Sequence, residues 1–374
     1  MHPALFILAL LGAFSLQIIY IQKRLISHIH TNQKVKYTLN IFLYINLIGI
    51  LFYALGRYYL SFPDWLYFLL SLPIGILFLL FSTAIVYDIL RFVLVRIPLS
   101  EKRRDFFKRS LDFSSLVVAT SISAKAIDNA RHIELEKVTI KLKNLKKPYK
   151  IVQLSDIHIG GIINKEFMQD VVTRVNACKP DLVVITGDLV DTDVDKAKEE
   201  LEVLKSLESK YGTYFIVGNH EYFHNIGKII LRVKELGIRV LENENIYIGN
   251  EDEGFNLAGV YDLFGYRTET YIPDIKQALK GQNKTSPTVL LAHQPKFIQE
   301  VPKGVDLMLS GHTHGGQLFP FQALVRLQQG YVKGLHQHNT HLQIYINKGT
   351  GFWGPPMRLG ASAEITEISL VTNS

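Results

Sequence analysis

The sequence predicts an α/β domain in which two sheets are flanked by helices, preceded by an N-terminal region of transmembrane helices. Three apolar runs in the first 90 residues predict the membrane region, and strands alternating with helices after residue 135 predict the α/β domain. The chain has 41 Lys and Arg and 34 Asp and Glu. Residues 1–150 hold 20 of the basic and 8 of the acidic residues, which gives them a net charge of +12. Residues 151–374 hold the other 21 basic and 26 acidic residues, which gives them a net charge of −5. Because the positive charge accompanies apolar runs, we expect no nucleic-acid partner.

Three stretches lack charged residues over a length that spans a bilayer: Pro3–Ile21, Thr38–Gly56 and Trp65–Tyr87. A spanning helix needs about 20 mostly apolar residues. Buried core helices are one alternative, and a cleaved signal peptide is another for the first run. Three such runs in succession disfavour core helices, and the lack of basic residues before the first run disfavours a signal peptide. We therefore assign residues 1–98 to a membrane region with three transmembrane helices.

The basic residues between and after these runs predict their orientation. Residues 22–37 carry four basic residues and no acid, and residues 88–110 carry seven basic residues. Because Lys and Arg stay on the cytoplasmic side, the N-terminus is predicted to lie outside and residues 88–110 inside. The prediction is a multi-pass membrane protein whose first partner is the lipid bilayer.

Residues 99–134 are predicted to form a basic juxtamembrane linker with a short apolar segment. Phe113–Ala124 is uncharged over 12 residues, which is too short to span a bilayer alone. It follows Arg103–Lys108, which resembles a twin-arginine export motif, and it ends in the small residues of Ser123–Ala126. We favour an embedded export signal, which would place residues 135–374 outside the cytoplasm. The alternatives are a fourth membrane segment or a basic segment on anionic lipid, the latter with a cytoplasmic domain.

Residues 135–374 are predicted to form one domain of alternating strands and helices. The predicted strands are Glu136–Lys143, Tyr149–Leu154, Asp181–Ile185, Thr213–Val217, Arg239–Leu241, Phe255–Val260, Thr288–Leu291, Leu307–Leu309, Leu342–Ile346 and Ala363–Leu370. The predicted helices are Phe167–Ala177, Ala197–Leu207 and Ile226–Glu235. Early βαβ units followed by strand-rich sequence favour two sheets with helices outside them.

Short polar clusters follow five of these predicted strands. Asp156 and His158 share one face of an extended chain, so the two side chains can bind one ion together. Asp188 and Asn219 follow the next two strands at intervals of about 30 residues, the length of a βαβ unit. Since open α/β sheets bind ligands at the carboxyl ends of their strands, we expect these clusters to meet there. The candidate ligands are Asp156, His158, Asp188, Asn219, His293, His312 and His314.

The chemistry of this ligand set predicts divalent metal ions. Carboxylate, amide and imidazole donors suit borderline cations such as Mn, Fe or Zn. Seven ligands are too many for one tetrahedral ion. They fit two ions that lie about 3.5–4 Å apart and share a carboxylate. The sequence therefore predicts two divalent metal ions of open identity.

Five motifs occur in order along the chain: Asp156-x-His158, Gly187-Asp188-x-x-Asp191, Gly218-Asn219-His220-Glu221, His293 and Gly311-His312-x-His314. In this order, and each after a strand, they resemble the calcineurin-like metallophosphoesterases over roughly residues 148–370. The tail from Asn347 to Gly360 and the N-terminal membrane region resemble the membrane-anchored bacterial branch of that family. The resemblance implies a four-layer α/β/β/α metallophosphoesterase sandwich in a bacterial inner or cell membrane.

The resemblance also implies a role for each residue. One ion would take Asp156, His158, Asp188 and His314, and the other would take Asp188, Asn219, His293 and His312. Asp188 would bridge the two ions. His220 would be a catalytic residue, either as proton donor or as a clamp on phosphate, and Asp191 would orient it.

The implied activity is hydrolysis of a phosphoester by a metal-bridging hydroxide. The substrate would be a phosphodiester, a phosphomonoester or a pyrophosphate, and membrane anchoring favours a lipid-linked or envelope precursor. A nucleotide phosphodiesterase is one alternative. A membrane sensor or scaffold that binds phospho-ligands without turnover is another. The sequence does not predict the oligomeric state.

A few other residues carry weaker functional signals. His336, His338 and His341 are interpreted as a polar turn between strands and not as a metal site. Arg358 fits a phosphate ligand or a structural ion pair equally. The apolar stretch from Phe352 to Pro356 is interpreted as either a lip near the membrane or loop packing. The single Cys178 excludes an intrachain disulfide framework.

Overall fold

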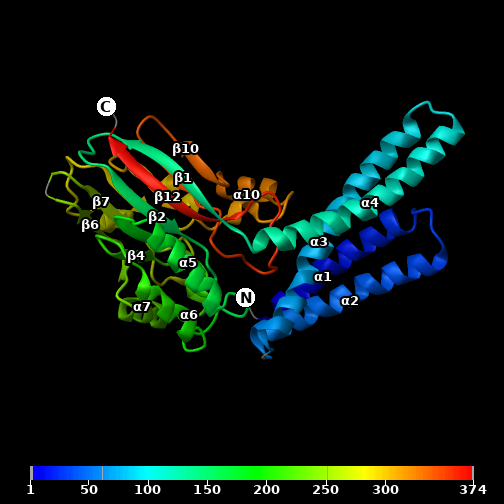
Figure 1. Ribbon diagram of the computed structural model, residues 1–374, viewed down its shortest axis with the longest axis horizontal. Helices are drawn as coiled ribbons and strands as arrows, with labels where there is room; N and C mark the ends of the chain where they lie inside the picture. The colour runs from blue at the N-terminus through cyan, green and yellow to red at the C-terminus, as the bar shows by residue number, and fades with distance from the viewer. Residues whose placement is uncertain (1–2, 61, 251, 373–374) are drawn as a thin grey trace. The chain divides into compact units, whose positions relative to one another are not determined.

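The computed structural model describes residues 3–60, 62–250 and 252–372, and it divides the chain into two compact units (Figure 1). The helical unit comprises Met1–Arg131 together with Gly354–Leu359. The sheet unit comprises His132–Trp353 together with Gly360–Ser374. The three-part division into 1–98, 99–134 and 135–374 stays a prediction.

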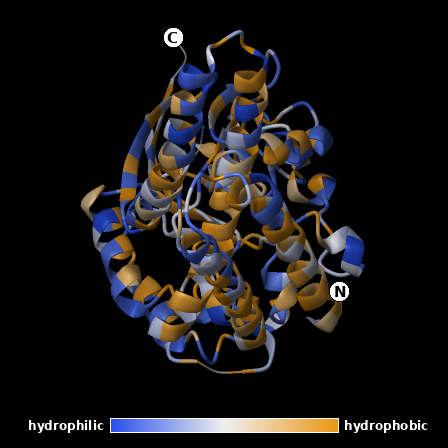
Figure 2. Cartoon of the chain, turned by 90° about the vertical axis from the view of Figure 1, so that its right-hand side faces the viewer, coloured by the Kyte–Doolittle hydropathy of each residue, from blue (hydrophilic) through white to orange (hydrophobic). Residues whose placement is uncertain are grey.

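The helical unit contains four long helices: α1 (Pro3–Ile21), α2 (Gln33–Tyr58), α3 (Asp64–Arg96) and α4 (Glu101–Ala130). A short π-helix, η1 (Gln22–Ile26), extends α1. Within the described residues, three segments are long and apolar enough to cross a membrane: Pro3–Ile26, Gln33–Tyr58 and Asp64–Arg96. Each contains one of the three predicted apolar runs. Figure 2 colours their hydrophobic residues orange.

Helix α4 occupies most of the stretch that the sequence predicted as a linker. Its buried residues follow a helical spacing on one face: Asp112, Ser115, Ala119, Ala126 and Ala130. Small side chains at this spacing let the helix pack closely against its neighbours. The uncharged run Phe113–Ala124 is thus the middle of a much longer helix.

The buried Asp112 and the half-buried Asp88 connect helices of the helical unit. Asp112 on α4 accepts hydrogen bonds from the Tyr87 hydroxyl at 2.7 Å and from the backbone N–H of His30 at 2.9 Å. Asp88 on α3 accepts from the Arg24 guanidinium at 2.7 Å and from the Tyr20 hydroxyl at 3.2 Å. Burying a carboxylate is favourable only with such partners, so these contacts specify how the four helices pack.

The sheet unit contains two six-stranded sheets. The first has the order β1-β12-β2-β3-β4-β5: Ile133–Leu142, Ala363–Thr372, Tyr149–Leu154, Leu182–Thr186, Thr213–Ile216 and Arg239–Val240. The second has the order β10-β11-β9-β8-β7-β6: Gly334–Gln337, Gln343–Ile346, Leu307–Ser310, Thr288–Leu291, Phe255–Gly259 and Glu244–Ile248. Strands β2, β3 and β4 are parallel neighbours, as are β8 and β9.

Short helices connect and cover these sheets. The α-helices are α5 (Lys165–Ala177), α6 (Lys198–Glu202), α7 (Ile226–Glu235), α8 (Gly265–Thr268), α9 (Ile275–Ala278) and α10 (Gln322–Gln329). The 3₁₀ helices are η2 (Val203–Ser206), η3 (Glu221–Phe223), η4 (Pro295–Glu300) and η5 (His314–Gly316). Asn164 caps α5 by accepting a hydrogen bond from the N–H of Phe167 at 3.0 Å.

The main core lies between the two sheets. Ile151, Val184 and Ile216 of the first sheet pack in one buried cluster with Leu257 and Leu309 of the second. On the other face of the second sheet, a separate buried cluster joins its strands to α9 and η4. Figure 1 shows α5, α6 and α7 along the outside of the first sheet. The layers are therefore α/β/β/α, as predicted.

Strands β6 and β10 were not predicted, and the helix predicted at Ala197–Leu207 is divided into α6 and η2. Both strands lie at an edge of the second sheet. Strand β10 is mostly exposed and β6 is partly buried, and neither has a clear apolar alternation. His336 lies in β10, whereas His338 and His341 lie in the turn that follows it. Arg358 is buried within the helical unit, where its backbone N–H donates to Ala126.

Candidate metal centre

The predicted site residues lie at the carboxyl ends of strands in both sheets. Asp156, Asp188 and Asn219 follow β2, β3 and β4, which run parallel. His293 and His312 follow the parallel pair β8 and β9. Parallel strands end at the same edge, so five loops deliver these side chains to one place.

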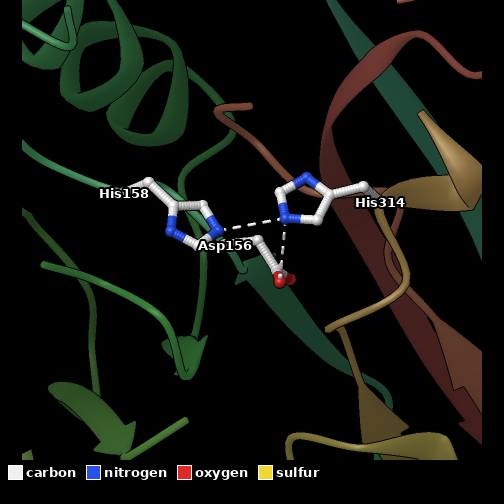
Figure 3. Close-up of side chains that lie close together, drawn as sticks. All are labelled: Asp156, His158 and His314. Atoms are coloured by element: carbon white, nitrogen blue, oxygen red, sulfur yellow. Dashed lines mark hydrogen bonds and ion pairs between the residues drawn. The ribbon is translucent and has the colours of Figure 1, made fainter. Parts of the chain in front are cut away.

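The first cluster contains Asp156, His158 and His314, whose ligand atoms lie within 4.8 Å of one another. The Nε2 atoms of His158 and His314 are 3.0 Å apart, and His314 Nε2 lies 3.5 Å from an oxygen of Asp156 (Figure 3). Two ring nitrogens from segments 156 residues apart thus face the same point as a carboxylate.

The second cluster contains Asp188, His293 and His312. His293 Nε2 lies 3.2 Å from Asp188 Oδ2, 3.3 Å from His312 Nδ1 and 3.2 Å from the side-chain oxygen of Asn219. The same Asp188 oxygen lies 3.9 Å from Nε2 of His158 in the first cluster. Asp188 is therefore placed between the two clusters.

A third group joins Asp191 to His158 and His220. One Asp191 oxygen lies 3.1 Å from Nδ1 of His158 and is also bonded to Nδ1 of His220. The Nε2 atom of His220 lies 3.9 Å from Asp188. The contact with Asp191 leaves that nitrogen directed toward the clusters.

Burial and charge oppose each other in this site. Burial alone would raise the pKa of Asp188, but the charges of His293 and His220 hold it below its usual range. Burial disfavours a charged His293, yet Asp188 holds the pKa of that ring well above its usual range. Burial, and next the charge of His293, lower the pKa of His312 to about 3. His312 is therefore a neutral imidazole, the form that binds a metal.

The residues fit divalent metal ions. Carboxylate, amide and imidazole donors converge, and nitrogen atoms of different histidines approach to 3.0 and 3.3 Å. Imidazole nitrogens this close to one another and to carboxylate oxygens are suited to bind a common cation. All seven residues predicted as ligands, together with Asp191 and His220, are brought together here.

The backbone around the clusters is held in an unusual conformation. Five of the predicted ligands adopt a positive φ in the left-handed region: Asp156 (51°), His158 (57°), Asp188 (51°), His312 (68°) and His314 (49°). This conformation costs about 1–2 kcal/mol for a residue with a side chain. Such residues gather at functional sites, because packing elsewhere compensates the strain.

Glu221 has a supporting position that sequence reasoning missed. Its buried carboxyl group accepts hydrogen bonds from the N–H groups of Asp188 (3.0 Å), Leu189 (2.8 Å), Val190 (3.2 Å) and Gly218 (2.6 Å). These bonds join the loop after β3 to the loop after β4. The sequence signal for Glu221 was its place in the motif Gly218-Asn219-His220-Glu221. The motif alone did not predict a role for its carboxyl group.

A pocket of about 480 Å³ adjoins the second cluster. Its lining includes Asn219 and His312 of the centre and two exposed cations, Arg267 and Lys296. Phe223 and Phe264 line it as well and pack ring against ring at 4.9 Å. The lining also includes Glu300, so the pocket combines a polar end at the cluster with an aromatic wall and charges of both signs.

Aromatic side chains flank His220 on two sides. The ring of Phe223 lies 5.4 Å from the His220 ring, and Trp353 lies 6.1 Å from it. The backbone N–H of Trp353 donates to the Gln317 side chain at 3.1 Å, and that side chain donates back to the Trp353 carbonyl at 2.8 Å. These contacts tie the loop carrying Trp353 to the segment that follows His314.

Residues 149–316 match the calcineurin-like phosphoesterase family. An "uncharacterized metallophosphoesterase" of Campylobacter jejuni is 36% identical over 367 residues, which cover 96% of each chain. The chain belongs to the calcineurin-like metallophosphoesterase family. The Asp and His clusters described above could hold metal ions in this family member.

Two other relatives match over part of their length. A metallophosphoesterase of Helicobacter pylori is 43% identical over 240 residues, which are 64% of each chain. The chain thus matches less than two thirds of that relative. A Bos taurus "transmembrane protein with metallophosphoesterase domain" is 37% identical over 233 residues, 59% of this metallophosphoesterase and 52% of the relative. With the three apolar helices, this likeness indicates an association with a membrane.

Proposed function

We propose that this metallophosphoesterase is a membrane-anchored hydrolase of phosphoesters that uses two divalent metal ions. The observation that carries the proposal is the position of Asp188 between two clusters of buried ligands. A carboxylate so placed is suited to bridge two cations about 3.5–4 Å apart.

The ligand assignment follows the two clusters. Asp156, His158 and His314 would hold one ion with Asp188, and Asn219, His293 and His312 would hold the other with Asp188. The ions would be Mn, Fe or Zn, which accept this mixture of nitrogen and oxygen donors. When bound, they supply a hydroxide near neutral pH and positive charge for the phosphate oxygens.

The remaining steps belong to residues of the chain. His220 would hold a proton at Nε2 and give it to the leaving oxygen, because Asp191 occupies its Nδ1. Arg267 and Lys296 would bind the charged part of the substrate in the adjoining pocket. Phe223 and Trp353 would keep water away from the reacting phosphate.

Replacing His220 tests this division of roles. We expect His220→Ala to lower kcat by about 10²- to 10⁴-fold, which is the usual contribution of a positioned proton donor. Metal content should stay unchanged, because His220 is not among the proposed ligands. The measurement is hydrolysis of bis-p-nitrophenyl phosphate by the purified full chain, with metal analysis of both proteins.

Asp191→Asn supplies the matched variant for that experiment. It keeps the shape of the side chain but removes the charge that orients His220, so a loss of about 10- to 100-fold is expected. A His220→Ala protein that keeps its metals and its wild-type turnover would contradict the assigned role.

We further propose that the protein is multi-pass and that its catalytic unit lies outside the cytoplasm. The substrate class proposed is therefore a lipid-linked or other envelope phosphoester. The excess of basic residues over residues 22–37 and 88–110 supports a multi-pass orientation with residues 88–110 inside. Export of the unit that follows is supported by the twin-arginine-like Arg103–Lys108 alone.

Protease accessibility tests this topology. In spheroplasts with intact inner membranes, we expect added protease to digest residues 135–374 before lysis, because an exported unit is exposed to it. A cytoplasmic marker protein should survive in the same sample and disappear only on lysis. Digestion of residues 135–374 only after lysis would place the catalytic unit in the cytoplasm.

A further inference from the structure

Helix α10 has two faces of opposite character. Gln328 and Gln329, at its end, line the pocket beside the second cluster. Gln329 marks the buried face, whereas Gln328 is exposed one turn after Leu324. Gln329 is buried, and its side chain accepts from the backbone N–H of Lys296 and donates to the Gln294 side chain, both at 3.3 Å. These contacts attach α10 to the wall of the pocket and fix which way its other face points.

The other face presents large apolar side chains to solvent. Leu327 is 84% exposed and Leu324 is 59% exposed. Just before the helix, Phe319 and Phe321 are 59% and 45% exposed. We call these four residues the apolar ridge. Single exposed apolar residues are ordinary, but four within nine positions mark a surface that meets an apolar partner.

The charge around the apolar ridge selects the partner. Residues 307–363 contain no Asp or Glu, although residues 151–374 as a whole carry a net negative charge. Arg326 on α10 and Lys333 just beyond it are exposed. Leucine and phenylalanine beside exposed cations, in a stretch of sequence without acids, form the pattern of a segment that lies in the interface of an anionic bilayer. The acid Glu300 lies in the adjoining pocket.

We propose that the apolar ridge docks onto the surface of an anionic lipid bilayer. Leu324, Leu327 and the two phenylalanines enter the boundary between headgroups and acyl chains, and Arg326 and Lys333 contact lipid phosphate. Three apolar helices of the same chain keep a bilayer within reach.

Docking has a consequence for substrate entry, and this part rests on the proposed function. The polar end of α10 borders the pocket, so a docked ridge brings the pocket to the height of lipid headgroups. A phosphoester whose apolar part stays in the bilayer could then reach the clusters without leaving the membrane.

Site-specific fluorescence tests the docking directly. The full chain, with Cys178→Ser, receives an environment-sensitive NBD probe at Leu327→Cys and is reconstituted in nanodiscs of anionic lipid. We expect blue-shifted emission that is quenched by lipids with a doxyl group near the headgroup, because the probe lies at shallow depth. Zwitterionic nanodiscs should give weaker quenching, since their surface lacks the net negative charge that attracts Arg326 and Lys333.

The matched control is Lys284→Cys with the same probe. Lys284 is exposed in the loop before β8, at the opposite end of that strand from the metal clusters. Its emission should be that of a probe in water and should resist quenching. Emission from Leu327→Cys that equals this control would overturn the proposal. Blue-shifted emission without lipid quenching would also overturn it and indicate a second copy of the chain.

Turnover measurements distinguish a failure of the docking proposal from a failure of the proposed function. The double variant Leu324→Ser and Leu327→Ser is expected to lower hydrolysis of a bilayer-embedded phosphoester by about tenfold. Hydrolysis of soluble bis-p-nitrophenyl phosphate should stay unchanged. Lipid quenching without any turnover would support the docking proposal and contradict the proposed hydrolase function. Equal loss on both substrates would contradict a role for the apolar ridge in lipid access.

Discussion

Asp188→Asn is expected to lower metal-dependent hydrolysis by at least about 10³-fold in kcat, because bridged metal ions contribute several kcal/mol to the barrier. Asp188 is buried and lies 3.2 Å from His293 and 3.9 Å from His158, one residue from each cluster. Asparagine keeps the shape but removes the negative charge that two cations would share. The measurement is kcat of the full chain with saturating metal, together with the metal content of the variant.

Asp195→Asn is the control for this experiment. Its side chain is 85% exposed and lies on the same connection after β3, so the same chemical change should leave kcat within about twofold of wild type. An Asp188→Asn protein that hydrolyses the substrate at the wild-type rate would show that Asp188 is not an essential ligand of the metal centre.

Glu221→Ala is expected to destabilise the sheet unit by about 3–5 kcal/mol, because it leaves four backbone N–H groups buried without their acceptor. For a unit of this size, that loss lowers the melting temperature by about 10 °C. Both loops that carry Asp188 and Asn219 depend on these bonds, so metal affinity should fall as well. Thermal unfolding of the metal-free full chain measures the first effect, and metal titration measures the second.

Glu221→Gln is a milder variant for comparison with Glu221→Ala. Its single side-chain oxygen accepts from two of the four N–H groups, whereas its NH₂ group faces the other two. We expect its melting temperature to lie between those of Glu221→Ala and wild type. An alanine variant as stable as wild type would show that the loops after β3 and β4 are held by other contacts.

The arrangement of the sheets could be predicted where strands are central and apolar. Tyr149–Leu154 and Thr288–Leu291 are continuous buried runs, and both form strands with the predicted bounds. Edge position alone does not remove this signal, because the predicted strands Glu136–Lys143 and Arg239–Leu241 form the edge strands β1 and β5. Glu244–Ile248 begins with two polar residues and is only partly buried except at Ile248, so its sequence gives no clear strand pattern.

Helix α4 shows a different limit. The sequence offered an uncharged run of 12 residues, and hydropathy alone gave it no clear assignment. Its helical packing depends on small residues and on Asp112, which bonds to Tyr87 on α3 and to the backbone of His30, 82 residues earlier. A tertiary contact of this kind leaves no periodic trace in hydropathy.

The candidate site was more predictable than its support. Each proposed ligand is a polar residue directly after a strand, so order along the chain is enough to bring the set together. Glu221 and the left-handed backbone at Asp156 and His158 were not foreseen. Their roles depend on which backbone groups meet across separate loops, and only the folded chain specifies that.

The metal content of the purified full chain, measured beside its turnover of bis-p-nitrophenyl phosphate, tests the central claim most directly. We predict two divalent ions for each chain, loss of turnover on chelation, and recovery when Mn, Fe or Zn is restored. Wild-type turnover by the metal-free protein, or a chain that binds no more than one ion at saturation, would contradict the claim of a two-metal centre.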